Sequence, residues 1–144
     1  MLHIKEGLKF NGVYHIEGWE NGVKTIDATY KNVVTQTLFT GLFNALDGNP
    51  DDLEITEMAL GSGTNTAMKS DTALQTEVFR KAISSKSFTA TQFIAKLSLA
   101  TSEAAFNIRE IGVFADTAML SRVNVNIDKN SSTQLLITYT LTAQ

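Results

Sequence analysis

Cysteine is absent from the 144 residues, proline occurs once, and no apolar run is long enough for a membrane-spanning helix. Without cysteine the chain forms neither disulfides nor thiolate metal sites, so its stability rests on packing, hydrogen bonds and subunit contacts. The sequence also lacks a basic-then-apolar leader that ends in small residues, which excludes a secretory signal. We therefore expect a protein that is made and folded in the cytoplasm.

Basic residues are few as well, since 12 Lys and Arg residues stand against 15 Asp and Glu residues and do not cluster along the chain. Nucleic-acid binding normally requires a basic patch, so this composition argues against it. The hydrophobic content of 43% and charged content of 19% are typical of a globular protein of one domain, residues 1–144. Within it we expect an N-terminal hairpin at 1–31, a helix at 32–48 and a β-sandwich at 53–144.

The segment from Leu8 to Tyr30 predicts two strands joined at Asn21-Gly22, because Asn-Gly supplies the positive φ angles of a type I′ hairpin turn. Alternate apolar residues give the first strand one buried face. Trp19 lies close to the turn, where it either caps that face or projects toward a partner. It is therefore a candidate exposed contact residue.

From Asn32 to Asp47 the apolar residues recur at a spacing of three and four, which predicts one helix over about residues 33–46. Asn32 or Thr35 is the expected N-terminal cap, and the Gly and Pro that follow Asp47 end the helix. The apolar stripe of this helix is expected to pack on a sheet.

The remainder of the chain predicts mainly strands, separated by polar turns and by one long loop at Gly61–Leu74. The expected strands are Glu54–Leu60, Glu77–Ser84, Ser87–Ala100, Asn107–Phe114, Met119–Ile127 and Thr133–Thr142. The last two alternate clearly between apolar and polar residues, so each buries one face. Only a short polar turn separates these two strands, and we expect them to pair as an antiparallel hairpin.

This order of elements predicts a mainly β protein, an antiparallel β-sandwich or flattened barrel with an N-terminal hairpin and one helix packed on the sheet. No motif announces a catalytic, metal or cofactor site. The two histidines, His3 and His15, have no partner ligands at a spacing suited to zinc. Gly61-Ser62-Gly63 has neither nucleophile-elbow nor phosphate-loop spacing, and its glycines are explained as turn residues.

An acidic cluster between the helix and the next strand resembles a calcium-binding loop only superficially. Asp52 stands where an EF-hand needs glycine, and Met58 stands where it needs the bidentate glutamate. A solvated turn accounts for these residues. The cluster is Asp47, Asn49, Asp51, Asp52 and Glu54.

Five charged residues lie among apolar residues of the predicted strands and are candidates for structural or interface pairing. They are Glu77, Arg80, Arg109, Glu110 and Arg122. A buried charge needs a charged partner, so we expect Glu77 or Glu110 to pair with one of the three arginines, in a structural rather than a catalytic role. On a regular strand Glu77 and Arg80 would point to opposite faces, and on an irregular turn or short helix they could meet.

Together these segments resemble structural proteins of tailed bacteriophages. The pieces that carry the resemblance, in order, are KNVVT at 31–35, MALGSGT at 58–64, DTAL at 71–74 before Glu77 and Arg80, IREIGVF at 108–114 and LSRV at 120–123. The order is similar to that of virion proteins with a helix-plus-β-sandwich module, in tail, baseplate and fibre-associated components. It covers residues 31 to 142.

The resemblance implies a non-enzymatic virion protein, made in the bacterial host, that assembles as a homo-oligomer, with trimers favoured, and docks onto other virion proteins. The chain stops at Gln144 without a long shaft or receptor-binding head. We therefore expect a tail, baseplate or fibre-attachment role rather than host recognition. Capsid decoration or a head fibre is the alternative within this class.

Two functions of other classes stay open. A carbohydrate-binding module for host glycans would usually present aromatic platforms, and this chain has only Trp19 and three dispersed tyrosines. The polar strand faces that carry Thr138, Thr140, Thr142, Asn124 and Asn126 are expected to be solvent surface, with a wet subunit interface as the alternative. An enzyme would depend on Asp71, Glu77 and Glu110, the only candidate carboxylates.

Overall fold

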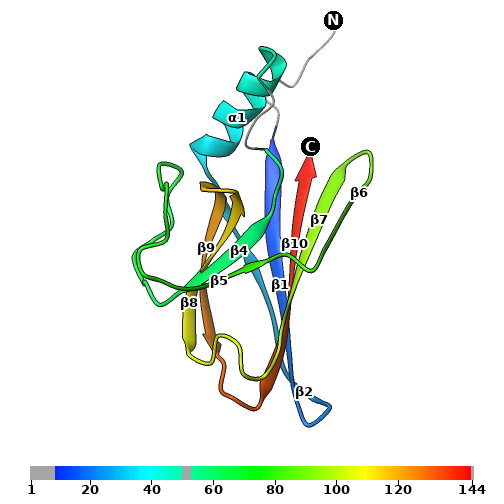
Figure 1. Cartoon of the computed structure of the whole chain (residues 1–144), viewed down its shortest axis with the longest axis vertical. Coiled ribbons are helices and arrows are strands. Elements are labelled where there is room, and N and C mark those ends of the chain that lie inside the picture. The colour runs from blue at the N-terminus through cyan, green and yellow to red at the C-terminus, as the bar shows by residue number, and fades with distance from the viewer. Residues whose placement is uncertain (1–8, 50–52, 144) are drawn as a thin grey trace, which may run out of the picture.

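The first two strands of the chain form a hairpin with its turn at Asn21-Gly22. Both residues have positive φ angles, 50° and 77°, as a type I′ turn requires. They join β1 (Phe10–Glu20) to β2 (Val23–Lys31) in antiparallel register. A computed structural model of the chain describes residues 9–49 and 53–143 (Figure 1). The predicted strand start at Leu8 lies outside the described residues.

Two five-stranded antiparallel sheets pack face to face. Sheet A has the order β2-β1-β10-β7-β6, and sheet B has the order β3-β9-β8-β4-β5. The remaining strands are β3 (Val33–Val34), β4 (Glu57–Gly61), β5 (Glu77–Ala82), β6 (Ser85–Phe88), β7 (Gln92–Leu99), β8 (Asn107–Ala115), β9 (Ala118–Asp128) and β10 (Thr133–Ala143). The sandwich prediction is confirmed.

The predicted pairing of the last two strands is wrong. β9 pairs with β3 and β8 in sheet B, whereas β10 pairs with β1 and β7 in sheet A. The polar turn between them therefore carries the chain from one sheet to the other. Lys129 anchors this crossing, because its backbone N–H donates to Phe106 and its buried ammonium group donates to the carbonyl of Thr101.

The predicted strand at Ser87–Ala100 is in fact the hairpin of β6 and β7. Its turn contains neither glycine nor proline. Instead, the Thr89 hydroxyl accepts hydrogen bonds from the backbone N–H groups of Thr91 and Gln92, which closes the turn.

The core lies between the sheets, and β1, β4, β7, β8, β9 and β10 contribute its buried residues, largely at alternate positions. Val123 and Ile127 of β9 and Leu135 and Ile137 of β10 belong to it, as the alternation predicts. The rings of Tyr14 and Tyr139 meet across β1 and β10 with 4.8 Å between their centroids.

Helix α1 (Gln36–Leu46) begins three residues later than predicted, because Val33 and Val34 pair with β9 as strand β3. Thr35 is the N-terminal cap residue, but its hydroxyl donates to the carbonyl of Met119 and does not cap the helix. The helix contacts the end of β9 through its first turn, where Leu38 is buried, and extends beyond the sandwich (Figure 1). No helix of the described residues is long and apolar enough to cross a membrane.

Candidate functional site

The loop at residues 62–76, between β4 and β5, covers the outer face of sheet B. Its one buried apolar residue, Leu74, packs with Ala59, Phe114 and Met119 in a small cluster separate from the main core. β8 is buried on both faces as a result: one face contacts the main core, and the other contacts this cluster and the loop. With so little apolar surface, the loop needs polar anchors to stay in place.

Glu110 is the main anchor. Its side chain is fully buried and accepts hydrogen bonds from three backbone N–H groups of the loop. Gly63 donates to Oε2 at 2.8 Å, Gln75 donates to Oε1 at 2.8 Å, and Thr76 donates to Oε2 at 2.7 Å. One carboxylate therefore holds both ends of the loop, and charge-assisted bonds of this kind are stronger than neutral ones.

Arg122 supplies the compensating charge. Its Nε and Nη2 atoms lie 3.1 and 3.0 Å from Oε1 of Glu110, and its side chain is almost fully buried. Nη1 donates to Asp71 at 2.9 Å, and Nη2 donates to the carbonyl and side-chain oxygens of Asn65. Because Arg122 opposes Gly112 across β8 and β9, it lies diagonal to Glu110. We call Glu110 and Arg122 the loop clamp.

The two glycines of the Gly-Ser-Gly turn allow the loop to approach this carboxylate. A Cβ atom at Gly61 would lie 2.6 Å from Oε2 of Glu110, and one at Gly63 would lie closer still. Neither glycine has a positive φ angle. Glycine is therefore needed here for close approach, to Glu110 at both positions and also to the backbone oxygen of Thr76 at Gly61, rather than for an unusual backbone conformation.

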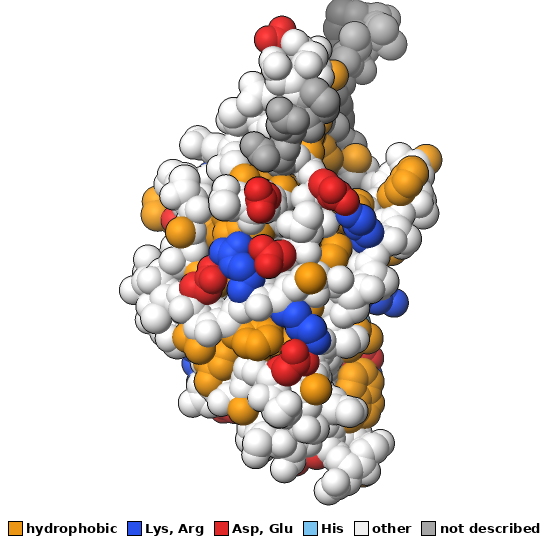
Figure 2. Space-filling view, in the orientation of Figure 1, with side chains coloured by type: hydrophobic (Ala, Val, Ile, Leu, Met, Phe, Trp, Pro, Cys, Tyr) orange, Lys and Arg blue, Asp and Glu red, His pale blue; other side chains and the backbone are white. Residues whose placement is uncertain are grey.

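Arg80 and Glu77 meet beside this region. Arg80 donates to both oxygens of Glu77, at 3.0 and 2.6 Å, and its guanidinium carbon lies 3.9 Å from the ring centroid of Phe114. The pair forms at a register irregularity between β4 and β5, which removes the strict alternation of faces. Hydrogen bonding to Glu77 raises the pKa of Arg80. Figure 2 shows several basic side chains in the middle of this face beside acidic ones.

The other predicted residues lie apart from the clamp. Arg109 points away from Glu110 and donates to Asp128 at 2.8 Å. Trp19 is half-buried, 5.8 Å from the ammonium group of Lys24, and lines a depression of about 490 Å³ beside Leu136. Of the five charges singled out from sequence, the structure brings together Glu110 with Arg122 and Glu77 with Arg80.

A second buried polar network joins β1 of sheet A to β9 of sheet B, and sequence reasoning missed it. The hydroxyl of Tyr14 is 2.7 Å from that of Ser121, which Asn32 also contacts. Burial raises the pKa of Tyr14 well above its usual value and that of Tyr139 to about 12. Such a network leaves no periodic pattern, because its members come from separate strands.

The described residues hold no group of three or more His, Asp or Glu side chains suited to a metal ion. Asp51 and Asp52 of the acidic cluster, and His3, lie outside the described residues. The side chains of the loop clamp are engaged in holding the loop, and every Glu110 oxygen already accepts hydrogen bonds. This arrangement fixes a surface and offers no free nucleophile or base.

The comparisons with known proteins agree with a structural reading. No curated protein and no solved structure matches the chain. One family model does, over residues 26–136, from the second strand of the first hairpin into β10. The match includes the clamp, both glycines of the turn and helix α1. The chain therefore belongs to the family of the N-terminal region of phage tail-collar fibre proteins.

Proposed function

We propose that this protein is a non-enzymatic component of a phage tail that assembles as a homo-oligomer, with a trimer favoured. In this proposal it docks onto another virion protein in the tail, baseplate or fibre-attachment region. The family match over residues 26–136 is the observation that carries the proposal. The saturated loop clamp supports it, because its polar groups stabilise a surface instead of forming an open reaction site.

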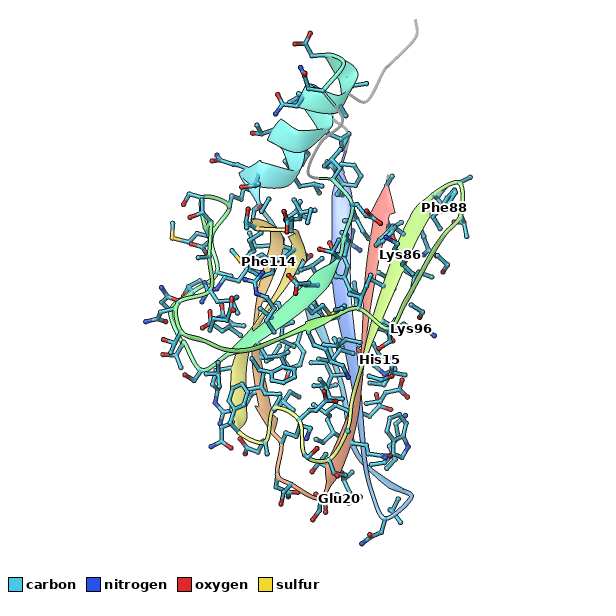
Figure 3. The ribbon with its side chains drawn as sticks, viewed as in Figure 1. His15, Glu20, Lys86, Phe88, Lys96 and Phe114 are labelled. Carbon is cyan, nitrogen blue, oxygen red and sulfur yellow. The ribbon has the colours of Figure 1, made fainter. Side chains whose placement is uncertain are left out.

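One end of the molecule suits such docking. Helix α1 and the tip of the β6–β7 hairpin lie at this end (Figure 1), and Phe88 sits at the hairpin tip (Figure 3). Phe43, Leu46 and Phe88 are 65%, 79% and 82% exposed. Large apolar side chains exposed at one end of a molecule are candidates for contact with a partner where they form a contiguous patch.

Electron microscopy of the intact parent particle, with this protein labelled, tests the location. Label on the tail, baseplate or fibre base is the expected result. Label on the capsid lattice would instead favour a decoration or head-fibre protein, and absence from the particle would refute both.

A glycan array tests the carbohydrate-binding alternative. We expect no signal, because Trp19 is the chain's one tryptophan and is half-buried beside Lys24. Binding of a host glycan that is lost in Trp19→Ala would contradict a purely structural role.

A further inference from the structure

Three lysines that lack a carboxylate partner gather around one depression. Within the described part of the chain, no Asp or Glu oxygen lies within 4 Å of the ammonium group of Lys9, Lys31 or Lys69, whereas most other basic side chains form ion pairs. All three line a depression of about 590 Å³ between the β1–β2 ends, β3 and α1. Among residues 9–49 and 53–143, no acidic side chain contributes to its lining. We call it the basic hollow.

A depression of opposite charge lies at the other edge of sheet B. It has a volume of about 560 Å³, and Glu54, Glu57 and Asp116 line it with no basic residue among them. Lys86 and Arg80 lie nearby, paired with Glu54 at 2.6 Å and with Glu57 at 3.5 Å. We call it the acidic hollow.

The two hollows lie too far apart to contact each other within one copy, so a contact between them joins two copies. β3, which borders the basic hollow, is one edge of sheet B, and β5, which borders the acidic hollow, is the other edge. Four inter-strand spacings separate these edges, roughly 19 Å. A surface that meets a different, complementary surface on the next copy forms a heterologous contact. Such contacts form a ring where the rotation between copies closes and a filament where it does not.

We propose that the basic hollow of one copy binds the acidic hollow of the next copy, so that the homo-oligomer is held head to tail. This proposal rests on the homo-oligomer of the proposed function and names its two surfaces. Charge complementarity identifies the occupant, because among the described residues the lining of one hollow has three lysines and no carboxylate, whereas the lining of the other has three carboxylates. Lys86 and Arg80 pair with two of these carboxylates, and Asp116 forms no ion pair with a described residue. Like-charged hollows repel, which also fixes the direction of the contact.

Sedimentation velocity of the full chain over a concentration series tests the proposal. We expect association at about 0.01 M ionic strength that weakens at about 1 M, where the screening length falls from roughly 30 to 3 Å. Reversing the charge of the basic hollow with Lys31→Glu and Lys69→Glu should weaken association by roughly 30-fold or more. Loss of one exposed ion pair has a small effect, but charge reversal also adds repulsion between the two hollows. Lys96→Glu is the matched control, because Lys96 is also exposed and lines neither hollow.

The complementary reversal is Glu54→Lys with Glu57→Lys, which should weaken association to a similar extent. A variant that carries all four reversals exchanges the two charges and should regain association. Thermal unfolding checks that each variant is folded. If the acidic reversal does not fold, the neutral pair Lys31→Gln and Lys69→Gln decides, with a smaller expected loss.

Each outcome is decisive. An oligomer that tolerates reversal of the basic hollow overturns these surfaces while the homo-oligomer stands. Loss in both reversals without recovery in the fourfold variant overturns direct pairing of the two hollows. A wild-type monomer at every concentration overturns this inference and the homo-oligomer together, but leaves the tail location to microscopy of the particle.

Discussion

Replacing Glu110 by glutamine tests whether the loop clamp holds the 62–76 loop on sheet B. The substitution keeps the size and shape of the side chain and removes its charge. One of its two acceptor oxygens also becomes an NH₂ group, which faces either a backbone N–H or the guanidinium group of Arg122. The buried arginine then keeps only the half-buried Asp71 as its counter-charge.

The expected cost is about 3 kcal/mol of unfolding free energy. Breaking a buried ion pair by removing one partner costs about 3 to 5 kcal/mol, and the remaining contact with Asp71 favours the lower end. In a domain of this size that loss lowers the melting temperature by roughly 10 °C. The exposed pair of Arg109 with Asp128 offers a control, since Arg109→Gln should cost less than about 1 kcal/mol.

Urea unfolding measures the global loss, and amide hydrogen exchange measures the local one. The amides of Gly63, Gln75 and Thr76 donate to Glu110, so their protection should fall more than that of β10 in the core. Adding Arg122→Met to Glu110→Gln removes the unpaired charge. We expect this double variant to be more stable than Glu110→Gln alone.

A loss below about 1 kcal/mol for Glu110→Gln would refute the argument, because it would mean that the buried charge is compensated without its partner. Unchanged exchange of the three amides would refute it separately. In that case the packing of Leu74 on Phe114, and not the carboxylate, would hold the loop.

Three further changes test other parts of the structure. Gly63→Ala should lower the unfolding free energy, measured in urea, by about 1 to 3 kcal/mol because its Cβ would collide with Glu110. At the exposed Ser62, the control Ser62→Ala should change it by no more than about 0.5 kcal/mol, and equal losses would contradict the need for close approach. The raised pKa of Tyr139, about 12 when folded against about 10 when unfolded, means that stability is complete below pH 10 and falls by about 3 kcal/mol as the pH rises to 12. In Tyr139→Phe this alkaline fall should be shallower, and an unchanged slope would count against burial as its cause. Arg80→Lys keeps the charge but loses the planar contact with Phe114, and thermal unfolding should show a loss of about 1 kcal/mol; a wild-type melting temperature would show that the contact contributes nothing.

The strands, their buried faces and the pairing of β1 with β2 could be predicted from the sequence, whereas the other strand partners could not. Alternation shows that Val123 and Ile137 face a core, and both do. It does not show whether two neighbouring strands share a sheet or face each other across the core, since each arrangement buries the same residues. The four-residue turn after Asp128 fits both, and this is why the β9–β10 pairing was predicted wrongly.

The loop clamp could be predicted in part. Charged residues inside apolar strands indicate buried pairs, and Glu110 and Arg122 are such residues. The backbone N–H groups that donate to Glu110 leave no trace in the sequence. The two glycines that let the loop backbone approach Glu110 are the exception. Asn65, Asp71 and Asn124 hold the middle of the loop, and no periodicity marks them, because they depend on how the loop folds back.

The mode of anchoring determines which part of the loop is free to change. Backbone hydrogen bonds to one buried carboxylate and a single buried leucine hold the ends of the loop, and Asn65, Asp71 and Asn124 hold its middle. The side chains of Thr64, Thr66 and Ser70 are exposed. Their identity therefore contributes little to folding, provided that the clamp and the two glycines remain. Loops on a rigid scaffold commonly carry recognition. This loop thus gives sheet B an outer surface whose chemistry can vary without altering the sandwich beneath it.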